Sequence, residues 1–490
     1  MDQLTFTPAS LLAKAIREKA VSVKEVVQAH LNQINAVNPA INALVQSTAA
    51  SALAEAGAAD AAIARGDALG PLHGVPFTVK DNIETKGIVC ACGTTGLAQN
   101  IPTEDAIVVS RIRAAGGILL GKTNLPEVGL GYETDNLIYG RSNNPYDLSR
   151  TTGGSSGGEA ALIAAGGSPL GLATDGGGSA RWPAHCCGIV GIKPTTGRTA
   201  KIGHVPPPGG VINPFWQMSL MARSVADLSL ALPLICGPDP RDPSAVPVPF
   251  PELGKMDLGQ SQKQLAPRDR TLAHRFFEKG ATAVRVAVFT DNGIVSPTPR
   301  IAQMVNQCAD SLAQAGAIVS QVCPPMIGEA HPIYVHLLSA DGGVGLGELL
   351  KSWGTREAHP NTKKVQVAQQ QHQLTAGEFG GWLYELDQFR QRMSIFMTDY
   401  DAILCPVAPL PAVAHGNTMP NPTYAGFDPM FSYLVPFNLT GWPCGTVRAG
   451  TSPEGLPLGI QVAANAWRED IVLALLAFLE AEHGGWQPPA

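Results

Sequence analysis

Two glycine clusters flank an apolar segment in GGSSGGEAALIAAGGSPLGLATDGGGSARWP, residues 153–183. Within it, EAALIAA is typical of a buried helix and LGLAT, residues 170–174, of a buried strand. Serines stand in both clusters, at positions 155, 156 and 179. A flexible glycine-serine linker would not run directly into core elements. The stretch therefore predicts serine hydroxyls held on loops at the ends of a buried helix and a buried strand.

Strand candidates alternate with helix candidates along the rest of the chain. Helices are predicted for most of residues 1–66, where SVKE at 22–25 forms a capping box, and for 106–117 and 468–482. Strands that are apolar throughout are buried on both faces. The pattern predicts an α/β fold with a sheet covered by helices on both faces. The predicted strands are VPFTV up to Lys80, ILLGKT after residue 117, and residues 170–174, 284–289, 317–322, 401–407 and 458–464.

The composition is that of a globular protein with a large core. Of 490 residues, 45% are hydrophobic and 15% are charged, and the net charge is −6. Lysines and arginines are scattered, which favours neither a nucleic-acid surface nor a membrane surface. We recognise no secretory leader and no apolar run of about 18 residues, so a cytoplasmic location is expected. Nine cysteines without framework spacing predict reduced thiols and no metal site.

GGILLGKT, residues 116–123, matches the pattern of a phosphate-binding loop. That motif needs an open loop between a strand and a helix, so that backbone N–H groups can surround a phosphate. Here a helix candidate comes first and the middle residues form the strand themselves. We expect Lys122 and Thr123 at a strand end, and no nucleotide site.

Several longer motifs occur in a fixed order along the chain. They are PLHGVPFTVKDNI, GKTNLPEVG, GGSSGG, GGGSARWPAHCCGIVGIKPTTGR, YDAILCPVAPLPA, FNLTGWPCGTV and GLPLGIQVAA. Through them the chain resembles the amidase signature family over nearly its whole length. The resemblance is closest to the fatty acid amide hydrolase-like, nylon-oligomer and urethane-hydrolysing bacterial branch. It implies one domain over residues 1–490, with a large, twisted, mixed β-sheet and no cofactor.

Three segments are set apart within this expected domain. Residues 1–66 form an N-terminal helical segment. Residues 237–270 are rich in proline and aperiodic, which predicts a surface excursion. Residues 325–400 lie where the family motifs match least, and we expect a variable region on the substrate side.

The resemblance implies a catalytic triad of two serines and a lysine. Matched motif by motif, Ser179 corresponds to the nucleophile, Ser155 to a bridging serine after a cis peptide bond, and Lys80 to the base. The residue chemistry agrees, because a lysine activates a hydroxyl only when neutral, so its pKa of ~10.4 must fall to about 7. The apolar strand before Lys80 is suited to burying the side chain, and burial lowers a lysine pKa. A surface lysine paired with Asp81 is the alternative.

The second glycine cluster fits an oxyanion hole, because glycines let backbone N–H groups converge on one point. The candidate donors are Gly176, Gly177 and Gly178. A supporting network, including an ion pair that fixes the loop, is assigned to Ser156, Thr174, Asp175 and Arg181. We interpret His185 as a packed histidine.

Apolar residues near the triad are candidates for the pocket wall, with ordinary core packing as the alternative. They are Trp182, Phe215, Trp216 and Met218. GHVPPPGG, residues 203–210, is a candidate entrance loop. The nucleophile loop reads A-T-D-G-G-G-S-A-R where the family usually has G-T-D-x-G-G-S-[IV]-R. The smaller Ala173 and Ala180 predict extra room at the acyl site, which would fit bulky or carbamate substrates.

We therefore expect a serine hydrolase that cleaves C–N bonds of small amides or carbamates through an acyl-enzyme on Ser179. Esterase side activity and a homodimer are compatible with this interpretation. The alternative is a glutaminase-type subunit of a tRNA-dependent amidotransferase complex. A binding role without catalysis is a third hypothesis, which labelling of Ser179 by a fluorophosphonate would contradict.

Overall fold

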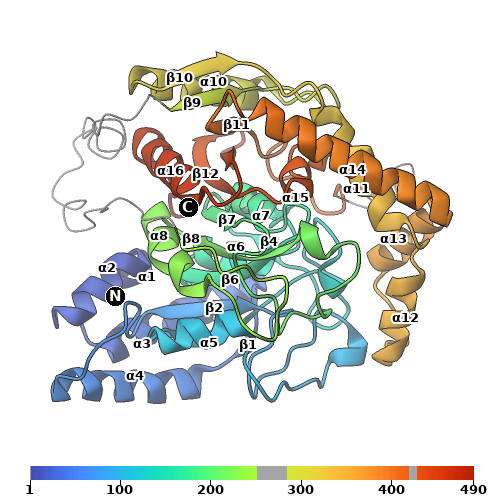
Figure 1. The fold of residues 1–490 in the computed structure, drawn as a ribbon. Coiled ribbons are helices and arrows are strands. Elements are labelled where there is room, and N and C mark those ends of the chain that lie inside the picture. The colour runs from blue at the N-terminus through green and yellow to red at the C-terminus, as the bar shows by residue number, and fades with distance from the viewer. Residues whose placement is uncertain (1, 251–283, 419–427, 490) are drawn as a thin grey trace.

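A mixed sheet of eleven strands runs through the described part of the protein (Figure 1). The structure, a computed structural model, describes residues 2–250, 284–418 and 428–489. The strands of the sheet are β1 Leu44–Ser47, β2 Pro76–Lys80, β3 Ile118–Thr123, β6 Leu170–Asp175, β7 Val190–Lys193, β8 Gln217–Ala222, β9 Arg285–Val288, β10 Ile318–Gln321, β11 Ala402–Pro406, β12 Cys444–Thr451 and β13 Pro457–Ala464. Their spatial order is β1-β3-β2-β6-β8-β7-β12-β13-β11-β9-β10. A separate hairpin pairs β4 Asn143–Asn144 with β5 Asp147–Thr151.

Parallel strands lie toward both ends of the sheet, and antiparallel strands join them. β2 is parallel to β3 and β6, and β9 is parallel to β10 and β11. The strands from β6 through β8, β7, β12 and β13 to β11 are antiparallel neighbours. Carboxyl ends of parallel strands meet at the same edge of a sheet. Lys80 ends β2 and Asp175 ends β6, so both lie at this edge.

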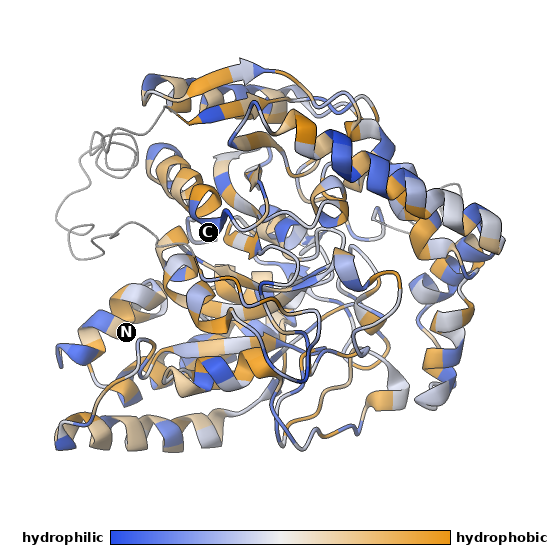
Figure 2. Ribbon diagram, viewed as in Figure 1, coloured by the Kyte–Doolittle hydropathy of each residue, from blue (hydrophilic) through white to orange (hydrophobic). Residues whose placement is uncertain are grey.

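Helices cover both faces of the sheet, because alternate strand residues enter two different cores. In β11, Ile403 and Cys405 pack into one core, and Ala402 and Leu404 into the other. The first core is covered by α3 Val23–Ile41, α6 Gly157–Ala164, α7 Arg181–Cys186, α11 Ala330–Ser339 and α14 Ala376–Phe396, and the second by α5 Ile107–Ala114, α8 Val225–Ile235, α10 Pro299–Gln314 and α16 Glu469–His483. Figure 2 shows apolar residues on the strands and on the covering helices, where they are interspersed with polar ones. The remaining helices are α1 Asp2–Thr5, α2 Ala9–Arg17, α4 Ala49–Arg65, α12 Val344–Ser352, α13 Pro360–Gln370 and α15 Pro436–Leu439.

The predicted α/β class is confirmed, and every strand predicted from apolar runs is present. The capping box at Ser22 and Glu25 is also present. In GGILLGKT the apolar residues form β3, as expected, and Lys122 and Thr123 end it. Four further strands of the sheet, and both strands of the β4–β5 hairpin, were not predicted. β1 interrupts the helical segment 1–66 with a half-buried LVQS, and β7 is only four residues long. β8 carries polar Gln217 and Ser219 and β12 carries Arg448, so neither reads as a continuous apolar run.

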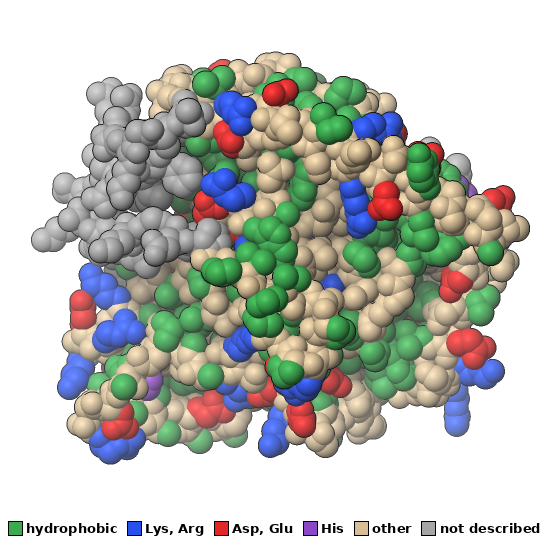
Figure 3. Space-filling model, viewed as in Figure 1, with side chains coloured by type: hydrophobic (Ala, Val, Ile, Leu, Met, Phe, Trp, Pro, Cys, Tyr) green, Lys and Arg blue, Asp and Glu red, His purple; other side chains and the backbone are tan. Residues whose placement is uncertain are grey.

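The proline-rich segment is described only as far as residue 250. Up to there it lies on the surface beside residues 197 and 198, since Val246 N donates to Gly197 O and Arg198 donates to Val248 O and Pro249 O. The prediction for residues 251–270 lies outside the described residues. No helix among residues 2–250, 284–418 and 428–489 has both the length and the hydropathy to cross a bilayer. On the face in Figure 3, basic and acidic side chains are interspersed.

Candidate active site

Lys80 is buried at the centre of the candidate site. The alternation of β2 sends Phe77 and Val79 into the core below α5 and α8, so Lys80 points to the opposite face. Its side chain is 0% exposed. There Nζ lies 2.6 Å from Ser155 Oγ and 2.8 Å from Thr174 Oγ1. The apolar strand thus delivers a lysine amine to two hydroxyls at the edge of the sheet.

Burial lowers the pKa of Lys80 to about 7, although the nearby carboxylates of Asp175 and Glu159 act in the opposite direction. Glu159, on α6, is buried as well, and burial raises its pKa to about 7. Its carboxyl group accepts hydrogen bonds from Thr78 and Thr123. A substantial fraction of Lys80 is therefore neutral near neutral pH, as a base must be.

Asp81 does not pair with Lys80. Its partner is Lys122 on β3, whose Nζ lies 3.5 Å from Asp81 Oδ1 and 2.6 Å from the carbonyl of Ile83. Both side chains of this ion pair are 0% exposed. The alternative of a surface lysine held by Asp81 is thus wrong.

The first glycine cluster places Ser155 just before helix α6. The peptide bond between Gly154 and Ser155 is cis, the geometry that the family resemblance implies. Gly158 allows α6 to pack on the chain after β3, because a Cβ at this position would lie 2.5 Å from the backbone nitrogen of Asn124. The two loops are joined by a backbone hydrogen bond of 3.1 Å from Ser156 N to Ser179 O. This bond sets the bridging-serine candidate beside the nucleophile candidate.

A buried ion pair holds the second glycine cluster in shape. Arg181 Nε and Nη2 each lie 3.0 Å from a carboxylate oxygen of Asp175, and both side chains are 0% exposed. Burial opposes ionisation of Asp175, but the charge of Arg181 and hydrogen bonds from Arg181 and Asn438 outweigh it and hold its pKa well below the usual range. The carboxylate also accepts from the backbone of Gly178 and Ala180. The Asp175 carboxylate thus accepts hydrogen bonds from several parts of the loop and fixes its conformation.

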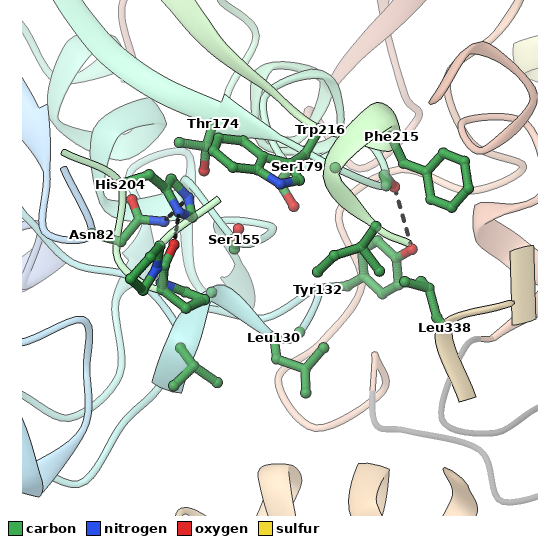
Figure 4. Close-up of a pocket in the computed structure, with 18 of the residues that line it drawn as sticks. Asn82, Leu130, Tyr132, Ser155, Thr174, Ser179, His204, Phe215, Trp216 and Leu338 are labelled. Carbon is green, nitrogen blue, oxygen red and sulfur yellow. Dashed lines mark hydrogen bonds between the residues drawn. The ribbon is translucent and has the colours of Figure 1, made fainter. Parts of the chain in front are cut away.

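Ser179 is half-buried and lines a cavity of about 180 Å³ together with Ser155 and Thr174 (Figure 4). Gly176 and Gly177 line the same cavity. Gly178 does not, because its N–H donates to Asp175 Oδ1 at 2.9 Å. Asp175 thus engages the Gly178 N–H, and Gly176 and Gly177 remain the candidate donors of an oxyanion hole.

Two tyrosines that the sequence did not single out contact this loop. Tyr334 Oη on α11 donates to Gly176 O at 2.9 Å, and Tyr132 Oη donates to Gly177 O at 3.3 Å. Both side chains line the cavity. Tyr334 falls in the region 325–400, which was expected on the substrate side, but no motif there distinguishes it.

Two of the four predicted wall residues line the cavity. Phe215 and Trp216 do, as Figure 4 shows. Trp182 and Met218 do not: Trp182 is 0% exposed and donates from Nε1 to Tyr132 O, and Met218 packs into the core on the other face of the sheet. Their assignment to the wall is corrected, since alternation in β8 and core packing of α7 turn them away.

Three residues in or near the nucleophile loop also belong to the core. Ala173 and Ala180, expected to leave room for an acyl group, are 0% exposed and are not among the lining residues. His185 is buried, and its two ring nitrogens lie 3.2 Å from Gly459 O and 3.0 Å from Leu410 O. These three residues belong to the packed core, and other residues line the space in front of Ser179.

The opposite wall contains an amide and an imidazole from separate motifs. Asn82 comes from VKDNI, and its Nδ2 lies 3.0 Å from His204 Nε2. His204 Nδ1 lies 2.7 Å from Pro206 O, in the predicted entrance loop, and the ring packs against Trp216 in a tilted arrangement. Burial lowers the pKa of His204 to about 3, so the ring is neutral and Asn82 donates to it. Both residues lie in sequence motifs noted above, but their spacing gave no sign that they line the candidate site.

The cavity carries no fixed charge on its described lining. Among the described residues that line it, none is lysine, arginine, aspartate or glutamate. Glycines, hydroxyls, aromatic rings, aliphatic side chains, the Asn82 amide and the neutral His204 ring form the surface in front of Ser179. A neutral group fits such a surface better than an ion, because a buried charge without a counter-charge is costly.

The site combines a buried lysine with two serine-bearing loops on a mixed sheet, and similarity to known proteins identifies the chain as a hydrolase. Residues 25–473 match the amidase family, and the chain belongs to this family, with the amidase signature that its motifs resemble. A glutamyl-tRNA(Gln) amidotransferase subunit of Salinispora arenicola (strain CNS-205) is 33% identical, with 100% of both chains covered. An acylamidase of Rhodococcus erythropolis is 32% identical, with 98% of this chain and 96% of the relative covered. The structure of 6-aminohexanoate cyclic dimer hydrolase complexed with substrate has a TM-score of 0.83 and 27% identity, covering 99% of each chain.

Proposed function

We propose that the protein is a free-standing amidase that cleaves neutral amides through an acyl-enzyme on Ser179, with Lys80 as base and Ser155 as relay. The observation that carries this proposal is the buried amine of Lys80, 2.6 Å from Ser155 Oγ in the cavity that Ser179 lines. Neutral Lys80 takes the Ser155 proton, and Ser155 takes the proton of Ser179. Ser179 then attacks the amide carbonyl carbon.

Departure of the leaving group and hydrolysis of the acyl-enzyme use the same groups, and Lys80 and Ser155 now return a proton. The N–H groups of Gly176 and Gly177 stabilise the oxyanion, and one such donor is worth ~3–4 kcal/mol. Lys80, now protonated, returns a proton through Ser155 to the leaving nitrogen, and the C–N bond breaks. Water then attacks the acyl-enzyme, activated by the same relay, and releases the acid. Thr174 helps to hold the Lys80 amine, and Asp175 with Arg181 keeps the glycine loop in place. Carbamates are proposed as further substrates, since they present the same carbonyl and leaving nitrogen.

A glutaminase-type subunit is the second candidate function, because the Salinispora relative is similar over the full length of both chains. Free glutamine carries an ammonium group and a carboxylate at once. Burying both ions requires paired counter-charges. The described lining of the cavity supplies none, which supports neutral amides over glutamine.

The isolated chain is expected to hydrolyse 4-nitroacetanilide with a kcat/KM about 100-fold or more above that for L-glutamine, because the glutamine ions would lie unpaired. Release of 4-nitroaniline and of ammonia measures the two reactions. Acetamide, which lacks both charges, is the control for the amide group of glutamine. A preference for glutamine over both neutral amides would favour the subunit function instead.

A further inference from the structure

A second, larger cavity opens beside the first. Its volume is about 770 Å³, against about 180 Å³ for the cavity of Ser179. The segment 206–212 bounds it on one side, and residues of helices α11, α12, α13 and α14 bound the other. We call this space the vestibule. The two cavities share seven lining residues, Val128, Leu130, Pro206, Pro207, Gly209, Ile212 and Leu338.

The vestibule surface is mostly apolar, and it carries few polar groups. Among its described lining residues, only Asp341 is charged, and its two carboxylate oxygens accept from the backbone of Gly343 and Gly345 at 2.8 and 2.7 Å. Gln369 Nε2 donates to Leu338 O at 3.0 Å, whereas its Oε1 has no hydrogen-bond partner among the described residues. Aliphatic side chains and Phe379 supply most of the remaining wall. Affinity here comes from burying apolar surface.

The position of Ser155 decides which part of a substrate reaches the vestibule. Ser155 protonates the leaving nitrogen in the proposed function, so the nitrogen and its substituent lie on the Ser155 side. Gly129 forms that side, since a Cβ on it would lie 3.7 Å from Ser155 Oγ. Its neighbours Val128 and Leu130 line both cavities. A substituent on the leaving nitrogen thus has a continuous apolar path outward.

We propose that the vestibule binds a neutral, apolar substituent on the leaving nitrogen, of the size of an aromatic ring or a longer alkyl chain. The substrate class is accordingly N-aryl, N-arylalkyl or N-alkyl amides and the corresponding carbamates. This inference rests on the proposed amidase function. It assigns the leaving-group subsite, which the proposed mechanism leaves open.

N-benzylacetamide and N-methylacetamide test this subsite, because they share the acetyl group and differ in the substituent on nitrogen. The parent enzyme is expected to turn over N-benzylacetamide with a kcat/KM about 10-fold or more higher. N-methyl-3-phenylpropanamide, with the ring on the acyl side, should show a smaller gain. Equal rates for the first two amides, or a larger gain from the acyl-side ring, would overturn the assignment. Absence of all three activities would contradict the proposed function instead.

A pair of variants on helix α12 locates the effect. Leu346 lines the vestibule but not the cavity of Ser179, whereas Val344 is 60% exposed and lines neither. Leu346→Lys is expected to lower kcat/KM for N-benzylacetamide about 10-fold, because a charge would enter the apolar wall, and to leave N-methylacetamide within about 2-fold. Val344→Lys should change neither. Retained turnover of N-methylacetamide shows that the variant is folded; an equal loss for both amides, or no loss, contradicts the proposal.

A different observation carries a second inference, that Tyr334 is a positioning residue for the oxyanion hole. In a trans peptide the carbonyl and the following N–H point in opposite directions. Tyr334 Oη holds Gly176 O, so it orients the N–H of Gly177. Tyr132 Oη holds Gly177 O and so orients the N–H of Gly178, which Asp175 already binds. We infer that only the Tyr334 hydroxyl aligns an N–H for the oxyanion.

Tyr334→Phe is expected to lower kcat about 10-fold with KM within about 2-fold, because the lost bond matters only when negative charge develops. Tyr132→Phe, the comparison variant, should lose less than about 3-fold. Affinity for a trifluoromethyl ketone, which forms a tetrahedral adduct with a serine, should fall in parallel with kcat for Tyr334→Phe. A change in KM alone, unaltered affinity for the ketone, or equal losses in the two variants would overturn the inference.

Discussion

Replacing Ser179 with alanine is expected to lower kcat for 4-nitroacetanilide by about 10⁵-fold or more, because removing a nucleophile removes the covalent route altogether. Binding and the oxyanion donors would sustain only the residual rate. The side chain is half-buried at the cavity wall, so its loss should leave the melting temperature nearly unchanged. Labelling by a fluorophosphonate should disappear with the activity.

The matched control is Ser168→Ala, in the same region of the chain. Ser168 is buried, but its hydroxyl donates to Leu170 O and it lies outside the cavity lining. This variant is expected to keep both labelling and turnover. Full labelling of Ser179→Ala would show that another residue is the nucleophile.

Lys80→Met is expected to lower kcat by about 10³-fold, within the range of ~10²–10⁴ that general bases contribute. Methionine has nearly the length of the lysine stem and suits the apolar surroundings, so the fold should persist. Rescue of the variant by added primary amines would strengthen the assignment. An unchanged kcat would remove this lysine from the mechanism.

The same lysine fixes how the rate of the parent depends on pH. In the proposed mechanism the neutral amine is the active form, and burial lowers the pKa of Lys80 to about 7. The rate should therefore rise with pH, reach half its maximum near pH 7 and level off above it, and this rise should be absent in Lys80→Met. A rate that fell with rising pH through this window would show that the protonated lysine is the active form.

The sequence predicted the elements in which apolar residues run without interruption. Continuous apolar runs such as residues 401–407 became buried strands, and a lysine at the end of such a run became a buried amine. Strands without such a run, such as the four-residue β7 and the polar-interrupted β8, were not recognised, because their pairing with distant strands leaves no local pattern.

Site residues that are brought together only by tertiary contacts could not be predicted from the sequence either. Tyr334 lies 158 positions from the glycine whose carbonyl it holds, and no local pattern encodes that contact. Trp182 illustrates the opposite error, because an aromatic residue next to the nucleophile loop proved to be a core residue. Proximity in sequence to a reactive group therefore did not determine which side chains surround it.

The guanidinium beside the nucleophile loop is also tied to parts of the chain that are synthesised much later. Arg181 donates to Leu434 O, Asn438 Oδ1 and Gln461 Oε1. A nascent polypeptide that has not yet emerged past position 461 cannot complete this anchorage. In the proposed mechanism, chains truncated before position 434 are therefore expected to be inactive even though they contain Lys80, Ser155 and Ser179.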